Sequence, residues 1–563
     1  MQLEPFILKE QTLGALLDAT ITRHPDADAI IHHERPLRQT WAEFGKSVDD
    51  LAKGLMALGV RKGEKVAVWA TNVPHWITLM FATARIGAVM VTVNTSYQSH
   101  DLEYLMNHSD SENLFMIDIY RDHDFIDILQ AVAPEIAVQP SDALNIARLP
   151  SLRRVFLMGD ERKRGLSCLA EVMALASRVS DADYEARKAQ VDPYDVVNMQ
   201  YTSGTTGFPK GVMLTHVNIV NNGYWIGRHQ NLSAQDRVCL PVPLFHCFGC
   251  VLGVMAFVNH GAAMVIIEAF NPLQVLRAVE KERCTGLYGV PTMFLSILEH
   301  KHFKRYDVST LRTGIMAGSV CPAPLMRRAV EEMNLSELTN CYGLTEGSPV
   351  MAQTHADEDF LHKTSTVGRA MPGIEVMVVD PSALPDRRVE VPRGSVGEVI
   401  CKGYNIMKGY YKMPEATAEA ITPEGWLRSG DLGTMDDDGY LVITGRGKDM
   451  IIRGGENIYP KEIEEFISGM DAVLDIQVVG VPSRKYGEEV VAFIILKPGR
   501  SLEAKDIRAF CKGRIAWYKI PRHVAFIDSY PLTGSGKIQK YKLREEAVRL
   551  FGVEADDDAE DEL

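Results

Sequence analysis

The chain has 563 residues, of which 46% are hydrophobic and 24% charged. These proportions are typical of a globular protein and exclude disordered, collagen-like and low-complexity classes. The formal net charge of −14 argues against nucleic acid or an anionic membrane surface as a partner, because no global cationic field attracts either.

Short β-branched runs alternate with stretches of helical periodicity from about residue 12 to residue 443. The first examples are a strand at 66–70, a helix at 76–86, a strand at 88–93 and a helix at 102–106. This alternation predicts an α/β fold with parallel strand pairing. The weakly patterned, charged segment at residues 140–195 is expected to form surface helix and loop before the next strand.

A strand expected at residues 196–201 leads directly into the segment Thr202-Ser-Gly-Thr-Thr-Gly-Phe-Pro-Lys-Gly211. Its glycines let the backbone bend, its hydroxyls can donate hydrogen bonds and Lys210 supplies a cation, which together suit phosphate oxygens. The spacing excludes a Walker A loop, because Pro209 precedes the lysine and Gly211 follows it. A solvent-exposed turn is the alternative, since Gly, Ser and Thr are common in turns. Thr215 is expected to cap the helix that follows.

Beyond Gly445 the pattern changes to a compact series of elements about a hundred residues long. Helices are predicted at 460–468, 503–514 and 542–550, and strands at 476–481, 490–496 and 524–527. A small second domain is therefore expected. The last residues, 553–563, carry seven acidic side chains and are predicted to be a solvated tail.

The cysteines and the apolar runs indicate where the protein resides. Nine scattered cysteines favour reduced thiols in a cytoplasmic compartment. Cys247 and Cys250 form a Cys-x-x-Cys, but their apolar neighbours and the lack of a second close pair argue against zinc or dithiol chemistry. Charged residues interrupt the N-terminal segment, which excludes a signal peptide. The longest uncharged apolar run, residues 247–258, is too short for a membrane span, so no integral membrane segment is expected.

The segment at residues 202–211 resembles the phosphate loop of the adenylate-forming enzymes, a family that includes acyl-CoA synthetases, firefly luciferase and peptide-synthetase adenylation domains. The resemblance implies a large N-terminal α/β domain with layered sheets flanked by helices, at residues 1–447, and a small mobile α+β domain at residues 448–552. It assigns catalysis to Lys210 and ATP binding to the loop residues Thr202, Ser203, Gly204, Thr205, Thr206 and Gly207.

The segment Asn340-Cys-Tyr-Gly-Leu-Thr-Glu346 is similar to the family's adenine and magnesium motif. By resemblance Tyr342 stacks on adenine beside Gly343, Thr345 contacts the α-phosphate and Glu346 holds Mg²⁺, a cation that prefers one or two carboxylates plus phosphate oxygens. Read alone, Tyr342 would be a core or interface residue and Glu346 a solvated helix end.

Two more segments are similar to nucleotide motifs of the family. Ala317-Gly318-Ser319 resembles the turn that packs on the other face of the base. Asp431, in the segment 426–433, matches the carboxylate that binds the ribose, and a carboxylate can accept two hydroxyl donors at once. Read alone, Asp431 would be an ordinary turn residue.

The segment at residues 445–460 coincides with the change in composition and is similar to the family's domain junction. The resemblance assigns Arg446 to the ribose and phosphate and Lys448 to the hinge on which the small domain rotates. Gly454 and Gly455, followed by Glu456, would let the backbone approach the pantetheine arm of coenzyme A; a β-hairpin turn is the alternative.

Lys537 lies on a glycine-rich loop, Pro531-Leu-Thr-Gly-Ser-Gly-Lys537. A lone lysine is usually a solvated surface charge. By resemblance Lys537 is the adenylation lysine, which bridges the acid's carboxylate and the α-phosphate of ATP. Its rotation away from the site would clear space for the second half-reaction.

The acid itself is expected to have an uncharged acyl or aryl tail. Residues 243–250 lack the aspartate that amino-acid-activating relatives place beside the substrate ammonium, and a buried ammonium without a partner is costly. His246 either closes the pocket near the carboxylate or is a hydrogen-bonded core residue. The pocket candidates are mainly apolar: Phe245, His246, Cys247, Val251, Val290 and Met351.

The strings that end at Phe294, Pro460 and Lys540 resemble the family member two branch of the acyl-CoA synthetases, which is associated with medium-chain fatty acids. The resemblance implies an AMP-forming fatty acyl-CoA synthetase that uses ATP, Mg²⁺ and coenzyme A, and it is compatible with a homodimer. Alternatives are acyl transfer to a carrier protein, an aryl or short-chain acid ligase, and a non-catalytic nucleotide or acyl-CoA binding protein on the same fold.

Overall fold

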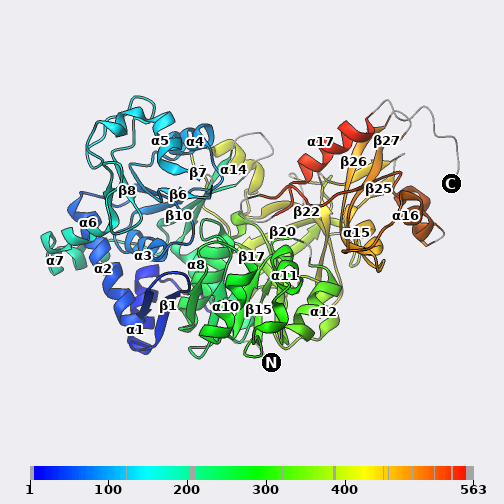
Figure 1. The fold of residues 1–563 in the computed structure, drawn as a ribbon, viewed down its shortest axis with the longest axis horizontal. Coiled ribbons are helices and arrows are strands. Elements are labelled where there is room, and N and C mark those ends of the chain that lie inside the picture. Colours follow the sequence, from blue (N-terminus) through cyan, green and yellow to red (C-terminus); the bar gives the residue numbers. More distant parts are fainter. Residues whose placement is uncertain are drawn as a thin grey trace. The chain divides into compact units, whose positions relative to one another are not determined.

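The computed structural model describes residues 5–121, 123–202, 209–319, 321–384, 388–447, 449–453, 456–483, 486–512, 514–533 and 537–552. The chain divides into two compact units (Figure 1). The larger unit consists of Met1–Val376 and Cys401–Leu427, and the smaller unit of Met377–Ile400 and Arg428–Leu563.

An eight-stranded sheet of the larger unit has a parallel body and an antiparallel edge. From β10 through β4, β3, β5 and β8 to β9 all neighbours are parallel, whereas β11 is antiparallel to β10 and to β21. In sheet order the strands are β21 (Gly409–Tyr410), β11 (Lys210–Thr215), β10 (Val196–Thr202), β4 (Val89–Thr92), β3 (Lys65–Trp69), β5 (Asn113–Met116), β8 (Arg154–Leu157) and β9 (Ser167–Cys168). The predicted α/β fold with parallel pairing is confirmed.

A nine-stranded sheet of the same unit also has a parallel centre, from β16 to β1. Its order is β18 (Arg369–Ala370), β17 (Val350–Gln353), β16 (Glu337–Gly343), β15 (Thr313–Met316), β14 (Gly286–Gly289), β12 (Arg237–Leu240), β13 (Ala263–Ile266), β1 (Asp28–His32) and β2 (Leu37–Thr40). A two-stranded ribbon joins β6 (Ile119–Tyr120) to β7 (His123–Asp124).

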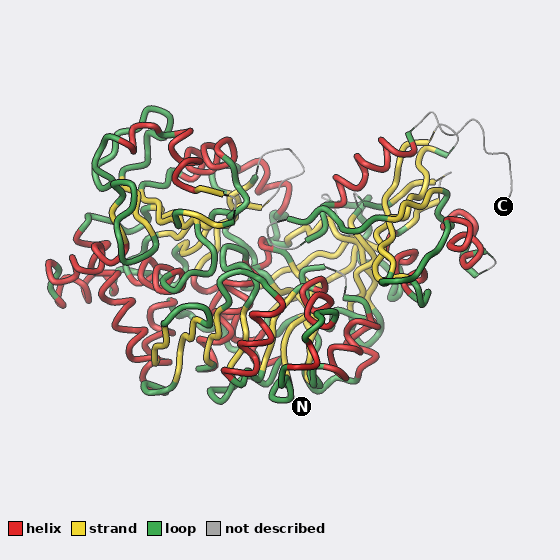
Figure 2. Tube along the Cα trace, viewed as in Figure 1, coloured by secondary structure: helices red, strands yellow, loops and turns green. Residues whose placement is uncertain are grey.

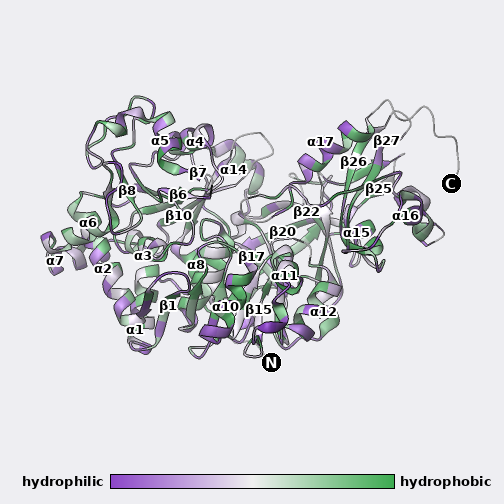
Figure 3. Ribbon diagram, viewed as in Figure 1, coloured by the Kyte–Doolittle hydropathy of each residue, from purple (hydrophilic) through white to green (hydrophobic). Residues whose placement is uncertain are grey.

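Helices pack around these sheets (Figure 2). They are α1 (Leu13–Arg23), α2 (Trp41–Ala57), α3 (Trp76–Arg85), α4 (Ser99–Ser109), α5 (Phe125–Val132), α6 (Leu169–Ala174), α7 (Asp181–Lys188), α8 (His216–His229), the π-helix η3 (Phe248–Met255), α9 (Ala256–His260), α10 (Pro272–Glu282), α11 (Pro291–Leu298), α12 (Ala323–Glu332), α13 (Phe360–Ser365) and α14 (Pro414–Ala420). Short 3₁₀ turns are η1 (Pro134–Ala137), η2 (Leu175–Arg178), η4 (Phe303–Arg305) and η5 (Thr345–Gly347). α3 is buried along its whole length, whereas α7 buries only Tyr184 and is largely hydrophilic (Figure 3).

The smaller unit combines antiparallel strands with three helices, as the predicted α+β pattern requires. Four strands form one sheet, β19 (Ile374–Val379), β20 (Gly397–Gly403), β22 (Leu427–Met435) and β23 (Leu441–Arg446). The other sheet holds β25 (Glu456–Ile458), β24 (Ile451–Arg453), β27 (Gly487–Leu496), β26 (Val473–Ser483) and β28 (His523–Phe526). Its helical elements are α15 (Pro460–Ser468), α16 (Ala504–Cys511), the 3₁₀ turn η6 (Trp517–Lys519) and α17 (Lys540–Phe551).

One expectation about the larger unit is wrong. The segment at residues 140–195 contains β8 and β9, the last two strands of the parallel ladder, in addition to surface helices. The four residues of β8 are too few to show a strand period, although three of them are buried and β5 and β9 pair with the strand on both sides. The other predicted elements are found, with ends shifted by one to a few residues.

Among the described residues, no helix has the length and apolar character needed to cross a bilayer. Lys448 and the acidic residues 553–563 lie outside the described residues. The domain boundary and the hinge therefore remain predictions.

Candidate active site

The ends of the predicted phosphate loop are fixed by an antiparallel strand pair. β10 ends at Thr202 and β11 begins at Lys210, and these two residues are paired across the ladder. The Nζ of Lys210 lies 4.9 Å from the centroid of the Tyr410 ring. Ser203, Gly204, Thr205, Thr206 and Gly207 lie outside the described residues. After β11, the predicted cap of α8 is confirmed: Thr215 Oγ1 accepts a hydrogen bond from the backbone N–H of Asn218.

Glu346 is held in place by two contacts from one segment. It lies in the 3₁₀ turn η5 after β16, where its carbonyl oxygen accepts a 2.9 Å hydrogen bond from the N–H of Met407. The hydroxyl of Tyr410 donates a 2.8 Å hydrogen bond to Glu346 Oε1. Burial and the neighbouring carboxylate raise the pKa of Tyr410, so its phenol remains a donor. Lys210, Tyr410 and Glu346 therefore form one cluster of a cation, a phenol and a carboxylate.

This cluster fits a magnesium phosphate complex. The second carboxylate oxygen of Glu346 remains able to coordinate a hard cation. Mg²⁺ usually takes only one or two carboxylates when phosphate oxygens complete its shell. The described residues contain no group of three or more His, Cys, Asp or Glu side chains that could form a metal cage of their own. A cation held at Glu346 would need phosphate oxygens to complete its shell.

The adenine candidates lie at the carboxyl ends of two neighbouring parallel strands. β15 is followed by the turn of Gly318 and Ser319, in which Gly318 has a φ of +91° that favours glycine. On β16, Tyr342 is half-buried. Gly343 cannot carry a side chain, because a Cβ would lie 1.7 Å from the carbonyl oxygen of Pro349. The structure thus brings the two predicted base-binding motifs to one edge of one sheet.

One of the acyl candidates, Cys247, contacts Thr345. Cys247 Sγ lies 3.5 Å from Thr345 Oγ1, and both residues are buried. His246 Nδ1 accepts a hydrogen bond from the N–H of Phe248, so its own loop orients the ring. Its role toward a substrate carboxylate remains a prediction. The other candidates, Phe245, Val251, Val290 and Met351, are all buried.

Strand register places three further residues in one row of the nine-stranded sheet. Tyr288, Ile315 and Thr339 are paired in one row across β14, β15 and β16 and therefore share a sheet face. Two residues further along each chain segment stand Val290 and Ala317, just past the ends of β14 and β15, and Cys341 on β16. The Tyr288 hydroxyl accepts a 2.7 Å hydrogen bond from Gln230 Nε2, and its ring contacts Phe257. We name the stretch from Val290, Ala317 and Cys341 to the buried Tyr288 the proposed acyl slot.

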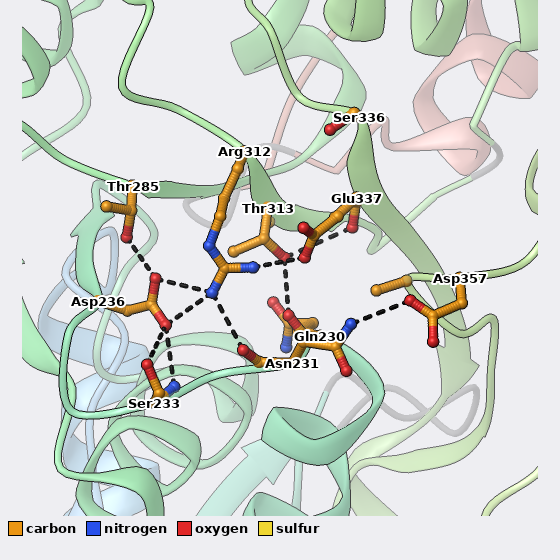
Figure 4. Close-up of polar contacts among 12 residues, drawn as sticks. Gln230, Asn231, Ser233, Asp236, Thr285, Arg312, Thr313, Ser336, Glu337 and Asp357 are labelled. Carbon is orange, nitrogen blue, oxygen red and sulfur yellow. Dashed lines mark hydrogen bonds and ion pairs between the residues drawn. The ribbon is translucent and has the colours of Figure 1, made fainter. Parts of the chain in front are cut away.

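A polar network anchors Gln230 under this slot (Figure 4). The carboxylate of Asp236 accepts hydrogen bonds from Arg312 at 2.7 and 2.8 Å and from Thr285 at 2.7 Å. Arg312 also pairs with Glu337 and donates to the carbonyl oxygen of Asn231. These bonds tie the loop after α8 to the amino ends of β15 and β16, which fixes the residue that holds Tyr288.

The remaining candidates belong to the smaller unit. Asp431 on β22 is buried and lies opposite Arg446 on β23, and its N–H donates to Ser429 Oγ. The backbone N–H of Lys537 donates a 3.0 Å hydrogen bond to Thr533 Oγ1. Glu456 begins β25, paired with Arg453. Lys448, Gly454 and Gly455 lie outside the described residues.

Sequence reasoning missed the residues that orient the candidates. Tyr410 is 64 positions from Glu346, and Gln230 is 58 positions from Tyr288. No local pattern links residues so far apart. The only signal was the glycine before Tyr410, which marks a bend after a short run.

Comparison with known proteins agrees with this geometry. Residues 17–411 match the family described as AMP-binding enzyme, and residues 462–537 match the AMP-binding enzyme C-terminal domain. A Bacillus subtilis protein named as acyl-CoA synthetase YngI is 51% identical over 546 residues, which is 97% of this chain and 99% of that protein. The medium-chain acyl-CoA ligase ACSF2, mitochondrial, of Bos taurus is 40% identical over 545 residues, 96% of this chain and 88% of that protein.

Solved structures agree as well. The crystal structure of ATP-bound MatB from Rhodopseudomonas palustris has a TM-score of 0.81 and 27% identity, and the match covers 96% of this chain and 100% of that one. The fold, the two matched domains and the relatives all indicate the same protein family. The chain belongs to the AMP-binding enzyme family, among its acyl-CoA synthetases, the ligases that form acyl-CoA.

Proposed function

We propose that this protein is an AMP-forming fatty acyl-CoA synthetase with medium-chain acids as its leading substrates. It converts ATP, a fatty acid and coenzyme A into acyl-CoA, AMP and pyrophosphate. The observation that carries the proposal is the position of Thr345: it directly precedes Glu346 of the Lys210, Tyr410 and Glu346 cluster, and its hydroxyl lies 3.5 Å from Cys247, one of the acyl candidates. Phosphate chemistry and an acyl tail meet at that residue.

In the first half-reaction a carboxylate oxygen of the acid attacks the α-phosphorus of ATP. A P–O bond forms, the bond to the β-phosphate oxygen breaks and pyrophosphate leaves with the electron pair. Lys210 and Lys537 are the cations that offset the approach of two negative charges, and Thr345 donates to the α-phosphate. Mg²⁺, held by Glu346, would supply further positive charge to the phosphates.

In the second half-reaction the coenzyme A thiolate attacks the carbonyl carbon of the acyl adenylate. A C–S bond forms and the C–O bond to AMP breaks, so that AMP leaves. No nucleophile from the protein is needed. In this proposal Lys210 and Glu346 act on the phosphates of ATP in the first half-reaction, and neither is needed after pyrophosphate departs.

The slot supports a chain of intermediate length. It is lined by Val290, Ala317 and Cys341 and ends at Tyr288, whose ring is fixed by Gln230. An apolar lining gives no partner to a charged tail, and a fixed ring limits how many methylenes fit. The name of the ACSF2 relative, a medium-chain acyl-CoA ligase, points the same way.

A cytoplasmic location fits the thiols. All nine cysteines lie among the described residues as free thiols, and eight of them are buried. Structural thiols of this kind persist where glutathione keeps them reduced.

A substrate panel tests the proposal. The protein is incubated with ATP, Mg²⁺ and each acid from acetate to palmitate, plus benzoate, with either coenzyme A or a holo carrier protein. We expect acyl-CoA by mass spectrometry, with the highest kcat/KM for medium-chain acids. Pyrophosphate release without acyl-CoA, but with acylated carrier protein, would favour carrier loading, and a preference for benzoate would favour an aryl ligase.

A further inference from the structure

The C-terminal half of α4 contacts each of the three strands that carry the phosphate side of the site. Tyr104 donates its hydroxyl to the carbonyl oxygen of Pro209, at 3.0 Å, immediately before β11. One turn later, His108 Nδ1 lies 2.8 Å from the hydroxyl of Tyr201 on β10. Asp110, which ends the helix, accepts a 2.9 Å hydrogen bond from the hydroxyl of Tyr411, the residue after β21.

Each of these contacts is next in sequence to a residue of the site. Tyr201 precedes Thr202, Pro209 precedes Lys210, and Tyr411 follows Tyr410. The three site residues share one face of the sheet: Thr202 is paired with Lys210, and Tyr410 is paired with Val212, two positions along β11 from that lysine. Successive side chains of a strand point to opposite faces, so Tyr201 and Tyr411 face away from the site, toward α4.

The helix residues reinforce one another. Tyr104 and His108 are four positions apart and their rings are stacked at 5.5 Å. The His108 ring meets both Tyr201 and Tyr411 edge to face, at 5.7 and 6.1 Å. Asp110 also pairs with Lys412 at 2.7 Å. A rigid aromatic group therefore holds three separate strands with one helix.

We propose that Tyr104, His108 and Asp110, here called the α4 clamp, are positioning residues that set Thr202, Lys210 and Tyr410 for the adenylation half-reaction. The inference rests on the proposed function, because it assigns those three residues to the phosphates of ATP. Lys210 is the first residue of β11, and its pair with Thr202 is the last one of the β10–β11 ladder. The ends of such ladders open locally unless other contacts hold them. The α4 clamp holds these strand ends from the sheet face opposite the site, so it does not contact the nucleotide.

The two half-reactions distinguish positioning from simple structural support. Adenylation needs the phosphate side of the site, whereas acyl-CoA formation from a supplied acyl adenylate does not. Loss of the clamp should therefore slow the first step and spare the second. A residue that only supports the fold would affect both steps together, because both use the same acyl slot and the same AMP.

The experiment compares Tyr104→Phe, His108→Phe and the double variant with the parent enzyme. Phenylalanine keeps an aromatic ring at each position and removes the polar contact. We measure pyrophosphate release from ATP, Mg²⁺ and octanoate in a single turnover, and octanoyl-CoA formation from synthetic octanoyl adenylate. The double variant is expected to release pyrophosphate about tenfold more slowly, since small displacements of catalytic groups carry large rate losses. Its thioester step should stay within about twofold of the parent.

Two controls sharpen the result. In His108→Asn the amide oxygen can still accept from Tyr201, so adenylation should return close to the parent rate. Thr310→Val removes a hydroxyl that donates to the carbonyl oxygen of Cys284 near the amino end of β15, and it should change neither step.

Parent-like pyrophosphate release in the double variant would overturn the clamp, and so would an equal fall in both half-reactions. A parent enzyme that releases no pyrophosphate with any acid would instead overturn the proposed function, and the clamp with it.

Discussion

The hydroxyl of Tyr410 donates a 2.8 Å hydrogen bond to Oε1 of Glu346, the carboxylate proposed to hold Mg²⁺. The bond fixes the side-chain rotamer of Glu346 and leaves its second oxygen for the cation. Tyr410 also lies under the Lys210 ammonium, at 4.9 Å from the ring centroid. One phenol thus orients both charged groups of the phosphate side.

Tyr410→Phe removes the hydrogen bond and keeps the ring under Lys210. We expect the Mg²⁺ concentration for half-maximal pyrophosphate release to rise roughly tenfold, as is common when a partner of a metal ligand is lost. Glu346→Gln should reduce the rate further at every Mg²⁺ concentration. An unchanged Mg²⁺ dependence in Tyr410→Phe would show that the bond does not serve the metal.

Lys537→Ala is expected to slow pyrophosphate release by about 100-fold or more, because a cation at the developing charge is lost. Octanoyl-CoA formation from supplied octanoyl adenylate should be largely spared. The matched control is Lys542→Ala, which removes an exposed lysine of α17 and should leave both steps unchanged. Parent-like adenylation in Lys537→Ala would refute the role assigned to this lysine.

Tyr288→Ala opens the far end of the proposed slot. Each additional methylene that enters contributes about 0.8 kcal/mol, so kcat/KM for longer acids should rise roughly fourfold per methylene relative to octanoate. Tyr288→Phe keeps the ring, loses the bond from Gln230 and should retain the parent chain-length profile. If dodecanoate gains nothing over octanoate in Tyr288→Ala, the slot does not end at this residue.

Arg312→Ala should lower the free energy of unfolding by about 3 to 5 kcal/mol, because it leaves the buried carboxylate of Asp236 without its cation. Arg35→Ala, which breaks an exposed pair with Glu268, is the matched control and should cost at most about 1 kcal/mol. Urea unfolding measures both. Equal losses in the two variants would mean that the network of Figure 4 contributes no more than a surface pair.

His216 links stability to pH. Burial lowers its pKa from 6.5 to about 4, and its Nδ1 accepts a hydrogen bond from the N–H of Leu13. The unfolded chain binds a proton near pH 6.5 and the folded chain does not, so stability is complete above that pH and falls as the pH drops toward 4. Between pH 7 and 4.5 this one group should cost about 2 kcal/mol.

His216→Asn keeps an acceptor for Leu13 and cannot take up the proton. Its free energy of unfolding should therefore depend less steeply on pH than that of the parent, by the same amount. Urea unfolding at pH 7, 5.5 and 4.5 provides the comparison. Parallel curves for the two proteins would show that His216 is not the group that titrates.

Local sequence patterns predicted the elements whose signals are local. Thr215 was identified as a cap from its place before a helical run, and Pro460 as the first residue of α15. β8 was missed because a strand of four residues, three of them buried, shows no period. Its burial depends on neighbouring strands that the sequence does not place.

The site shows the same division. The residues of the motifs could be named because each motif is a short string, although their roles remain proposals. The residues that orient them could not, because Tyr104 reaches a carbonyl 105 positions away and Tyr410 a carboxylate 64 positions away. Such contacts arise from topology and not from spacing.

The central claim is that the substrate carboxylate attacks the α-phosphorus of ATP. Octanoate labelled with ¹⁸O in both carboxylate oxygens tests it directly, with ATP, Mg²⁺ and coenzyme A present and the products analysed by mass spectrometry. The account predicts one ¹⁸O in AMP and one in octanoyl-CoA. Label in pyrophosphate or phosphate, or unlabelled AMP beside labelled octanoyl-CoA, would contradict it.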